Sequence, residues 1–72
     1  MKMNIRAENG RQIVEISGRL DSVTSGELEK KGLELVAGGA VKMVMDLAET
    51  DYISSAGLRT LLTLAKAARA KG

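Results

Sequence analysis

The feature that most constrains this fold is an apolar segment that leads into a helix through two adjacent serines. Residues 41–47 are almost continuously apolar, as is typical of a central strand of a parallel sheet. An acidic loop with Glu49 and Asp51 follows, and Ser54 and Ser55 begin a helix that we expect over residues 55–70. The first N–H groups of a helix lack partners, and the helix dipole favours negative charge there. A phosphate on one of these hydroxyls would be stabilised, which indicates a switch.

Two further strands are expected before the first helix. Apolar and polar residues alternate over 3–8, and Asn9-Gly10 is a dipeptide favoured in two-residue hairpin turns. Residues 12–17 have apolar side chains on both faces, which predicts a strand inside the sheet with the first strand at its edge. A right-handed crossover makes the second and third strands parallel. The fold class is therefore α/β, in the order β-β-α-β-α. The sheet is mixed, its first strand is antiparallel to the rest, and helices pack on it.

The helices show expected ends and apolar stripes. Thr24 and Glu27 fit a capping box at the start of the first helix, and Gly38-Gly39 is expected to end it with a left-handed cap. For the second helix, the apolar spacing predicts a buried stripe that comprises Leu58, Leu61, Leu62, Ala65 and Ala68.

Composition excludes several functions. The chain has 72 residues, enough for one domain at most, and it has neither cysteine nor histidine. Disulfides, thiolate metal sites and Ser–His catalysis are thereby excluded. No Phe or Trp is present and the net charge is only +2, so a nucleic-acid partner is not expected. No apolar run approaches the ~20 residues of a membrane span, and the first residues lack the apolar stretch that is typical of a signal peptide. We expect a cytoplasmic protein that has no metal, cofactor, membrane partner or enzymatic activity.

Two motifs resemble those of the STAS-domain family of anti-sigma factor antagonists. They are Ser17-Gly18-Arg19-Leu20-Asp21, and Asp46-Leu47 followed by Tyr52-Ile53-Ser54-Ser55-Ala56-Gly57-Leu58-Arg59. Their order and spacing match the family, and the resemblance extends from Met3 to Gly72. It implies a single STAS domain over residues 1–72. Because the family's domains continue with further strand and helix elements, the chain is expected to correspond to their N-terminal part.

The resemblance implies a switched protein–protein interaction. The unphosphorylated form of such a protein binds an anti-sigma factor that is also a serine kinase, and thereby releases the sigma factor. The kinase uses ATP to phosphorylate the antagonist, the complex dissociates, and a phosphatase resets the cycle. The alternative function is a STAS-type accessory subunit of a transporter. A serine hydrolase is disfavoured because the chain lacks both a Gly-x-Ser-x-Gly motif and a histidine.

The resemblance places the phosphoacceptor at Ser55, two positions before the motif glycine Gly57, with Ser54 as the alternative. From the residues alone, a serine at a helix start is more often a helix cap, although a pair of serines leaves one hydroxyl that capping does not need. The resemblance also makes Asp21 a partner-facing acid close to the acceptor, while the residues alone equally favour a helix-entry cap. The predicted partner-binding residues are Asp21, Asp51, Ser54, Ser55, Gly57 and Arg59.

Three of these residues have open interpretations. Asp51 either adds charge to the partner surface or is a solvated loop acid. Gly57 costs about 1 kcal/mol relative to alanine inside a helix, so we expect close packing there against the sheet or a partner. Arg59 lies one turn after Ser55, where it contacts a phosphate or a partner's acid, or is an ordinary exposed arginine.

The end of the chain carries one further expectation. If Gly72 is the true terminus, the apolar strand over residues 41–47 lacks a neighbour along one edge, and such an edge invites pairing with another chain. We then expect a homodimer or an exchange of elements between two chains rather than a stable monomer.

Overall fold

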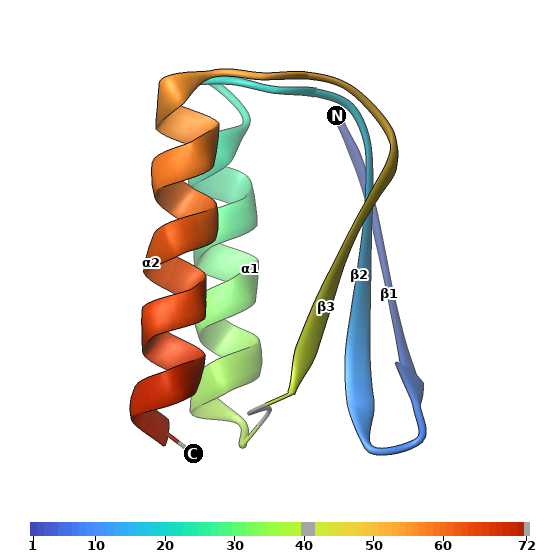
Figure 1. Cartoon of the computed structure of the whole chain (residues 1–72), viewed down its shortest axis with the longest axis vertical. Helices are drawn as coiled ribbons and strands as arrows, with labels where there is room; N and C mark the ends of the chain where they lie inside the picture. Colours follow the sequence, from blue (N-terminus) through green and yellow to red (C-terminus); the bar gives the residue numbers. More distant parts are fainter. Residues whose placement is uncertain (40–41, 72) are drawn as a thin grey trace.

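The computed structural model describes residues 1–39 and 42–71, so Ala40, Val41 and Gly72 lie outside the described residues. The elements follow the predicted order: β1 (Lys2–Glu8), β2 (Arg11–Leu20), α1 (Ser25–Ala37), β3 (Met43–Ile53) and α2 (Ser55–Lys71). Figure 1 shows the strands as one twisted layer, with both helices side by side on the same face. The predicted α/β fold is confirmed. The start of the third strand at Val41 is the one boundary that the structure does not describe.

β1 and β2 form the predicted antiparallel hairpin, paired from Lys2 opposite Ser17 to Glu8 opposite Arg11. Asn9 and Gly10 connect them with φ angles of 52° and 79°. Positive φ at both central positions matches the right-handed twist of the flanking strands, which is why this dipeptide makes a tight turn. The hairpin therefore follows from local sequence alone.

β3 extends further along the chain than predicted. It pairs in parallel with β2 as expected, but it continues to Ile53, and Ser17 and Leu20 of β2 pair with Glu49 and Ile53. The acidic segment is thus a strand rather than a loop. Pairing with the second half of β2 holds it extended, and the hydroxyl of Thr50 adds a hydrogen bond to the carbonyl of Ile16 at 2.8 Å. In the described residues the strand order β1-β2-β3 leaves one edge of β3 open, as expected where no further strand pairs with it. The dimer expected from an open edge stays a prediction.

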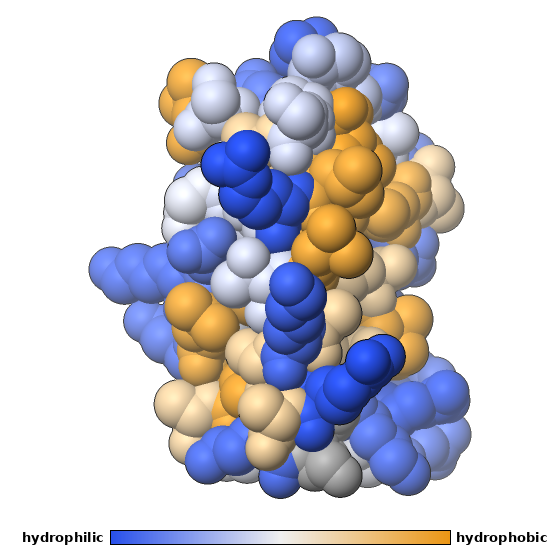
Figure 2. Space-filling model, turned by 60° about the vertical axis from the view of Figure 1, so that its left-hand side comes forward, coloured by the Kyte–Doolittle hydropathy of each residue, from blue (hydrophilic) through white to orange (hydrophobic). Residues whose placement is uncertain are grey.

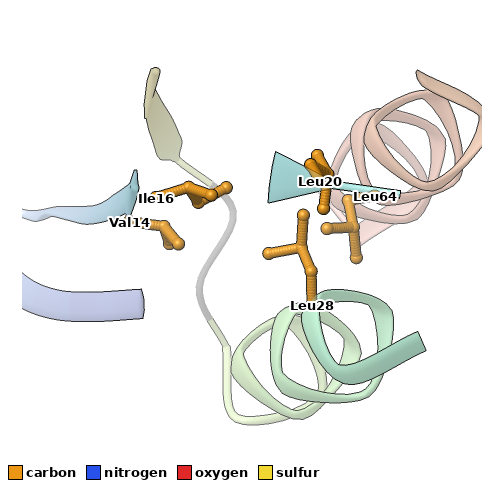
Figure 3. Packing of buried hydrophobic residues seen from close by; sticks show 5 residues of the cluster. All are labelled: Val14, Ile16, Leu20, Leu28 and Leu64. Atoms are coloured by element: carbon orange, nitrogen blue, oxygen red, sulfur yellow. The ribbon is translucent and has the colours of Figure 1, made fainter. Parts of the chain in front are cut away.

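The core lies between the sheet and the helix pair. Figure 3 shows the buried side chains of this core cluster, which are Val14, Ile16, Leu20, Leu28 and Leu64. Ile13, on the opposite face of β2, is also buried, which confirms β2 as the strand with apolar side chains on both faces. Gly32 lets the helices approach closely, because a Cβ at this position would lie 2.5 Å from a methyl carbon of Leu64.

The buried face of α2 differs from the predicted stripe. Its buried residues are Gly57, Thr60 and Leu64, whereas Leu58 and Leu62 are 54% and 55% exposed. Of the other predicted members, Leu61 and Ala68 are half-buried and Ala65 is exposed. The reason is that α2 packs mainly on α1 and turns its smallest residue toward β2. The helix is therefore rotated about its axis from the orientation that maximal leucine burial would give.

The start of α1 also departs from prediction. Thr24 is the N-cap residue, but its side chain makes no capping hydrogen bond, so the capping box with Glu27 was wrong. The Thr24 hydroxyl instead donates to the carbonyl of Arg19 at 2.8 Å and accepts from the N–H of Asp21 at 2.9 Å. At the other end, Gly39 adopts φ 105° and its N–H donates to the carbonyl of Val36. The expected glycine terminus, with a left-handed residue, is confirmed.

Candidate functional site at the start of helix α2

Parallel pairing of β2 and β3 brings the two sequence motifs together. Leu20 pairs with Ile53 at the last position of each strand, and the N–H of Ser54 donates to the carbonyl of Leu20 at 2.9 Å. Asp21 follows Leu20 directly, so the turn into α1 and the start of α2 lie at the same end of the sheet. The carboxyl ends of parallel strands are where α/β proteins commonly place their binding residues.

The two serines have different structural roles. Ser54 precedes the helix, and its hydroxyl accepts a hydrogen bond from the N–H of Gly57 at 3.2 Å. Its carbonyl accepts the helical bond from Leu58 at 2.9 Å, so Ser54 is the N-cap. Ser55 is the first residue of α2 and is exposed. Within the described residues the hydroxyl of Ser55 makes no hydrogen bond, so it is open to solvent.

The environment of Ser55 favours a negative group. The first turn of α2 contains no acidic residue. The N–H groups of Ser55 and Ala56 lie at the start of the helix, where no carbonyl of the same helix can pair with them. A phosphate on Ser55 would therefore meet unpaired N–H donors and the positive end of the helix dipole.

Asp21 organises the turn into α1. Its carboxylate accepts hydrogen bonds from the N–H groups of Val23 at 3.0 Å and Thr24 at 3.1 Å. The bond from Thr24 is the largest cause that lowers the pKa of Asp21. The N–H of Val23, the hydroxyl of Thr24 and the charge of Arg19 lower it further, against partial desolvation. Because Val23 and Thr24 precede α1 and Thr24 is its N-cap residue, Asp21 holds the turn before the helix and does not cap the helix itself. Its role in partner binding stays a prediction.

An interaction that the sequence did not suggest lies beside Asp21. Arg19 is paired with Tyr52 across β2 and β3, and its guanidinium carbon lies 4.2 Å from the centre of the tyrosine ring. The same guanidinium lies 3.6 Å from the carboxylate of Asp21. Arg19 and Tyr52 are far apart in the sequence, and the parallel register of β2 and β3 brings them together. The sequence signal that could have pointed to this contact was Tyr52, because it is the single aromatic residue of the chain.

Gly57 supports the site from within. It is buried, and a Cβ built on it would lie 2.7 Å from the carbonyl oxygen of Leu20 and 3.3 Å from a methyl carbon of Ile53. This confirms the expected close packing and assigns it to the sheet. Asp51 is exposed on β3 rather than in a loop, and Arg59 is exposed on α2. Their roles in partner binding stay predictions.

Apolar side chains surround this end of the molecule to an extent that the sequence did not reveal. Val23 is 84% exposed, and Ile53, Leu58 and Leu62 are 39%, 54% and 55% exposed. The spacing of both leucines predicts burial, yet they lie on the surface of α2. A surface hollow elsewhere, of about 480 Å³, lies over the sheet, is lined by residues such as Asn4, Glu15 and Glu49, and contains none of the predicted site residues.

Other kinds of site find no support in the described residues. Residues 1–39 and 42–71 contain no group of three potential metal ligands among Asp, Glu, His and Cys. Of the helices in this part of the chain, none combines the length and apolar character that a membrane crossing requires.

The sequence matches one family model over nearly its whole length. The model describes a Mlab-type STAS domain, and residues 3–72 match it. The chain belongs to the STAS-domain family. Its β1-β2-β3 sheet and two helices also match solved STAS structures. It aligns with an anti-sigma factor antagonist from Mycobacterium paratuberculosis at a TM-score of 0.84 and 28% identity, over 90% of this chain and 56% of the other.

Further relatives carry related names. BtrV of Bordetella bronchiseptica, named a candidate anti-sigma factor antagonist, is 38% identical over 69 residues, which are 96% of this chain and 60% of BtrV. RsfB of Mycobacterium tuberculosis, an anti-sigma-F factor antagonist, is 30% identical over 59 residues, or 82% of this chain and 48% of RsfB.

The anti-sigma factor antagonist SpoIIAA in its unphosphorylated form supports the fold alone. It aligns at a TM-score of 0.82 with 13% identity, over 96% of this chain and 64% of SpoIIAA. This STAS domain thus spans about half to two thirds of the length of the relatives it matches. Relatives of this kind are regulatory proteins that act on anti-sigma factors.

Proposed function

We propose that this STAS domain is the switched part of an anti-sigma factor antagonist. In its unphosphorylated form it binds an anti-sigma factor in the cytoplasm, and the sigma factor is released. The anti-sigma factor is also a serine kinase, which binds ATP and magnesium and transfers a phosphoryl group from ATP to Ser55. A separate phosphatase removes the phosphoryl group. The domain itself performs no chemistry beyond offering one hydroxyl.

The division of roles between the two serines carries this proposal. Ser54 supplies the cap of α2, so its hydroxyl is occupied by the N–H of Gly57. Ser55 is exposed beside it at the start of the same helix. A serine that is not needed for capping and that lies at an anion-favouring helix start is well suited to reversible phosphorylation. We therefore assign the acceptor to Ser55 rather than Ser54.

Phosphorylation would alter binding while the fold is kept. A phosphoserine carries about −1.5 to −2 charge and accepts several hydrogen bonds. At the start of α2 this charge is compatible with the helix, so the domain stays folded. On the surface it adds to the charge of the exposed acids Glu49 and Asp51 on β3 and of Asp21 on the turn after β2. A partner that accepts the neutral hydroxyl then faces a dianion.

The test is direct phosphorylation. Each anti-sigma factor of the source genome is purified, incubated with the domain and ATP, and the products are mapped by phosphopeptide analysis. We expect label on Ser55, loss of label in Ser55→Ala, and retention of label in Ser54→Ala. Label that persists in Ser55→Ala and disappears in Ser54→Ala would assign the acceptor to Ser54.

A further inference from the structure

The two asparagines of the chain lie in different surroundings, although both are exposed. Asn4 lies within β1, is followed by the branched residue Ile5, and donates a side-chain hydrogen bond to the carboxylate of Glu15 at 3.0 Å. Asn9 is followed by a glycine in the turn between β1 and β2, and its side-chain amide makes no hydrogen bond to any described residue. The amide of Asn4 is therefore held in place, whereas the amide of Asn9 is free to react.

The group that can react with this amide is the backbone nitrogen of Gly10. The hairpin pairs Glu8 with Arg11 and leaves the two turn residues outside the ladder, so the N–H of Gly10 donates to no backbone carbonyl of the described residues. Glycine has no Cβ that would crowd its nitrogen, and a Cβ built on Gly10 would meet nothing within 4 Å. The turn therefore has room for a cyclic imide between Asn9 and Gly10.

We propose that Asn9 is a modification site, at which the protein deamidates without an enzyme. The nitrogen of Gly10 loses its proton and bonds to Cγ of Asn9, the bond from Cγ to Nδ2 breaks, and Nδ2 takes up a proton and leaves as ammonia. Water then opens the imide. Opening at Cγ leaves aspartate, and opening at the backbone carbonyl carbon leaves isoaspartate, whose main chain runs through the side-chain carbons. Water is the only co-reactant, and no oxidant or metal takes part.

Charges around the turn favour loss of the proton from Gly10. The charged groups that face the turn and the surface hollow beside it are Glu8, Arg11, Glu34 and Lys42. Both acids are engaged in ion pairs, with Arg6 at 3.5 Å and with Lys31 at 3.8 Å. Neither base makes an ion pair within the described residues, and nearby positive charge stabilises an anionic nitrogen. Figure 2 shows strongly hydrophilic side chains gathered at the lower end of the molecule, where Figure 1 places this turn.

The turn lies where the fold is weakly constrained. Among the described strands, β1 is an edge strand that pairs only with β2, so strand pairing holds the hairpin tip from one side alone. Local opening of such a turn leaves the helix packing intact and costs less free energy than global unfolding. During each opening, the nitrogen of Gly10 can approach Cγ of Asn9. The reaction therefore proceeds in the folded domain.

Isoaspartate at this position would weaken the hairpin. A two-residue turn matches the twist of its strands only with positive φ at both central positions, and an additional main-chain carbon destroys this match. β1 supplies Met3 and Ile5, which pack against the core cluster. The conversion should therefore loosen β1 and lower the Tm of a small domain whose core is limited. This chemistry is independent of the proposed function and requires no partner.

Peptide mapping compares the two asparagines within one molecule. Trypsin cleaves after lysine and arginine, so it places Asn4 in the peptide that ends at Arg6 and Asn9 in the peptide 7–11. The purified protein is incubated at mildly alkaline pH, and mass spectrometry follows the conversion of amide to acid in each peptide. Isoaspartyl methyltransferase detects isoaspartate, and the same protein in urea gives the rate for the unfolded chain. The control variant is Asn9→Gly, which accepts positive φ and has no side-chain amide.

We expect conversion at Asn9 of the folded protein to be about ten-fold faster or more than at Asn4, because no Cβ crowds the nitrogen of Gly10. Both aspartate and isoaspartate should form, and the Tm should fall as isoaspartate accumulates, while the Tm of incubated Asn9→Gly stays constant. An Asn9 that stays intact in the folded protein while the unfolded chain converts would overturn the inference, because the turn then protects the amide. Equal conversion at Asn4 and Asn9 would also overturn it. Conversion without a fall in Tm would refute the weakening of the hairpin.

Discussion

A Cβ built on Gly57 would lie 2.7 Å from the carbonyl oxygen of Leu20, so the start of α2 rests directly on the end of β2. The neighbouring contact is backbone and cannot swing aside as a long side chain can. The close contact between Gly57 and Leu20 fixes how near the first turn of α2, with Ser54 and Ser55, lies to the end of β2. It links the packing of the domain to the geometry of the proposed phosphorylation site.

Gly57→Ala is therefore expected to destabilise the domain, by about 1–3 kcal/mol, because overpacking forces the helix start away from β2. In a domain of this size each kcal/mol corresponds to roughly 4–8 °C in Tm. The matched control is Gly26→Ala in α1, where nothing lies within 4 Å of the added carbon. That change should be neutral or stabilising by up to ~1 kcal/mol. Similar Tm values for the two variants would show that the contact at Gly57 relaxes freely.

Ser54 and Ser55 should respond differently to removal of the hydroxyl. Ser54→Ala loses the acceptor for the N–H of Gly57 and should cost about 0.5–2 kcal/mol. Ser55→Ala removes an exposed hydroxyl and should change the free energy of unfolding by less than about 0.5 kcal/mol. Urea unfolding of both variants measures the difference. A larger loss in Ser55→Ala would reverse the assignment of the cap.

Ser55→Asp should fold normally and bind the anti-sigma factor weakly, while Ser55→Ala binds and cannot be switched off. An acid in the first turn of a helix is stabilising by ~0.3–1 kcal/mol, so the loss of binding is expected without a loss of stability. Melting curves and calorimetric titration give the two quantities separately. A large fall in Tm for Ser55→Asp would indicate a structural serine and would count against the switch.

The turn around Asp21 should make stability depend on pH in acid. Its hydrogen bonds, above all the one from Thr24, lower the pKa of Asp21 in the folded state below the ordinary value of 3.8. A lowered folded-state pKa means that the stabilisation is fully present above 3.8 and is lost as the pH falls from there through the folded-state value. Asp21→Asn keeps an acceptor but removes the charge. It should melt lower than the unchanged protein at pH 7, and the difference should shrink toward pH 2.

For comparison, Asp51→Asn removes an exposed carboxylate of β3 that makes no side-chain hydrogen bond within the described residues. Its melting curve should stay close to that of the unchanged protein at both pH values. A constant gap between Asp21→Asn and the unchanged protein across the same pH range would mean that the charge of Asp21 does not contribute to the stability.

Local signals in the sequence were sufficient for much of this fold. Asn9-Gly10 determined the hairpin because both residues accept positive φ, and the helix spans were predictable from periodicity and from Gly38-Gly39. The serine pair and Gly57 marked the start of α2 as a candidate site, and the family motifs supplied its proposed function. Each of these structural signals depends on residues that lie within a few positions of one another in the sequence.

Tertiary contacts decided the rest. The segment with Glu49 and Asp51 is polar enough for a loop, and only its pairing with β2 makes it a strand. The Arg19–Tyr52 contact depends on the same parallel register. The spacing of Leu58 and Leu62 predicts a buried stripe, yet the rotation of α2 about its axis leaves both leucines exposed. Gly57 fits against Leu20, and Leu64 fits over Gly32. The rotation of a helix about its axis is determined by how well its side chains fit surfaces that are distant in sequence. Apolar periodicity alone therefore does not predict this rotation.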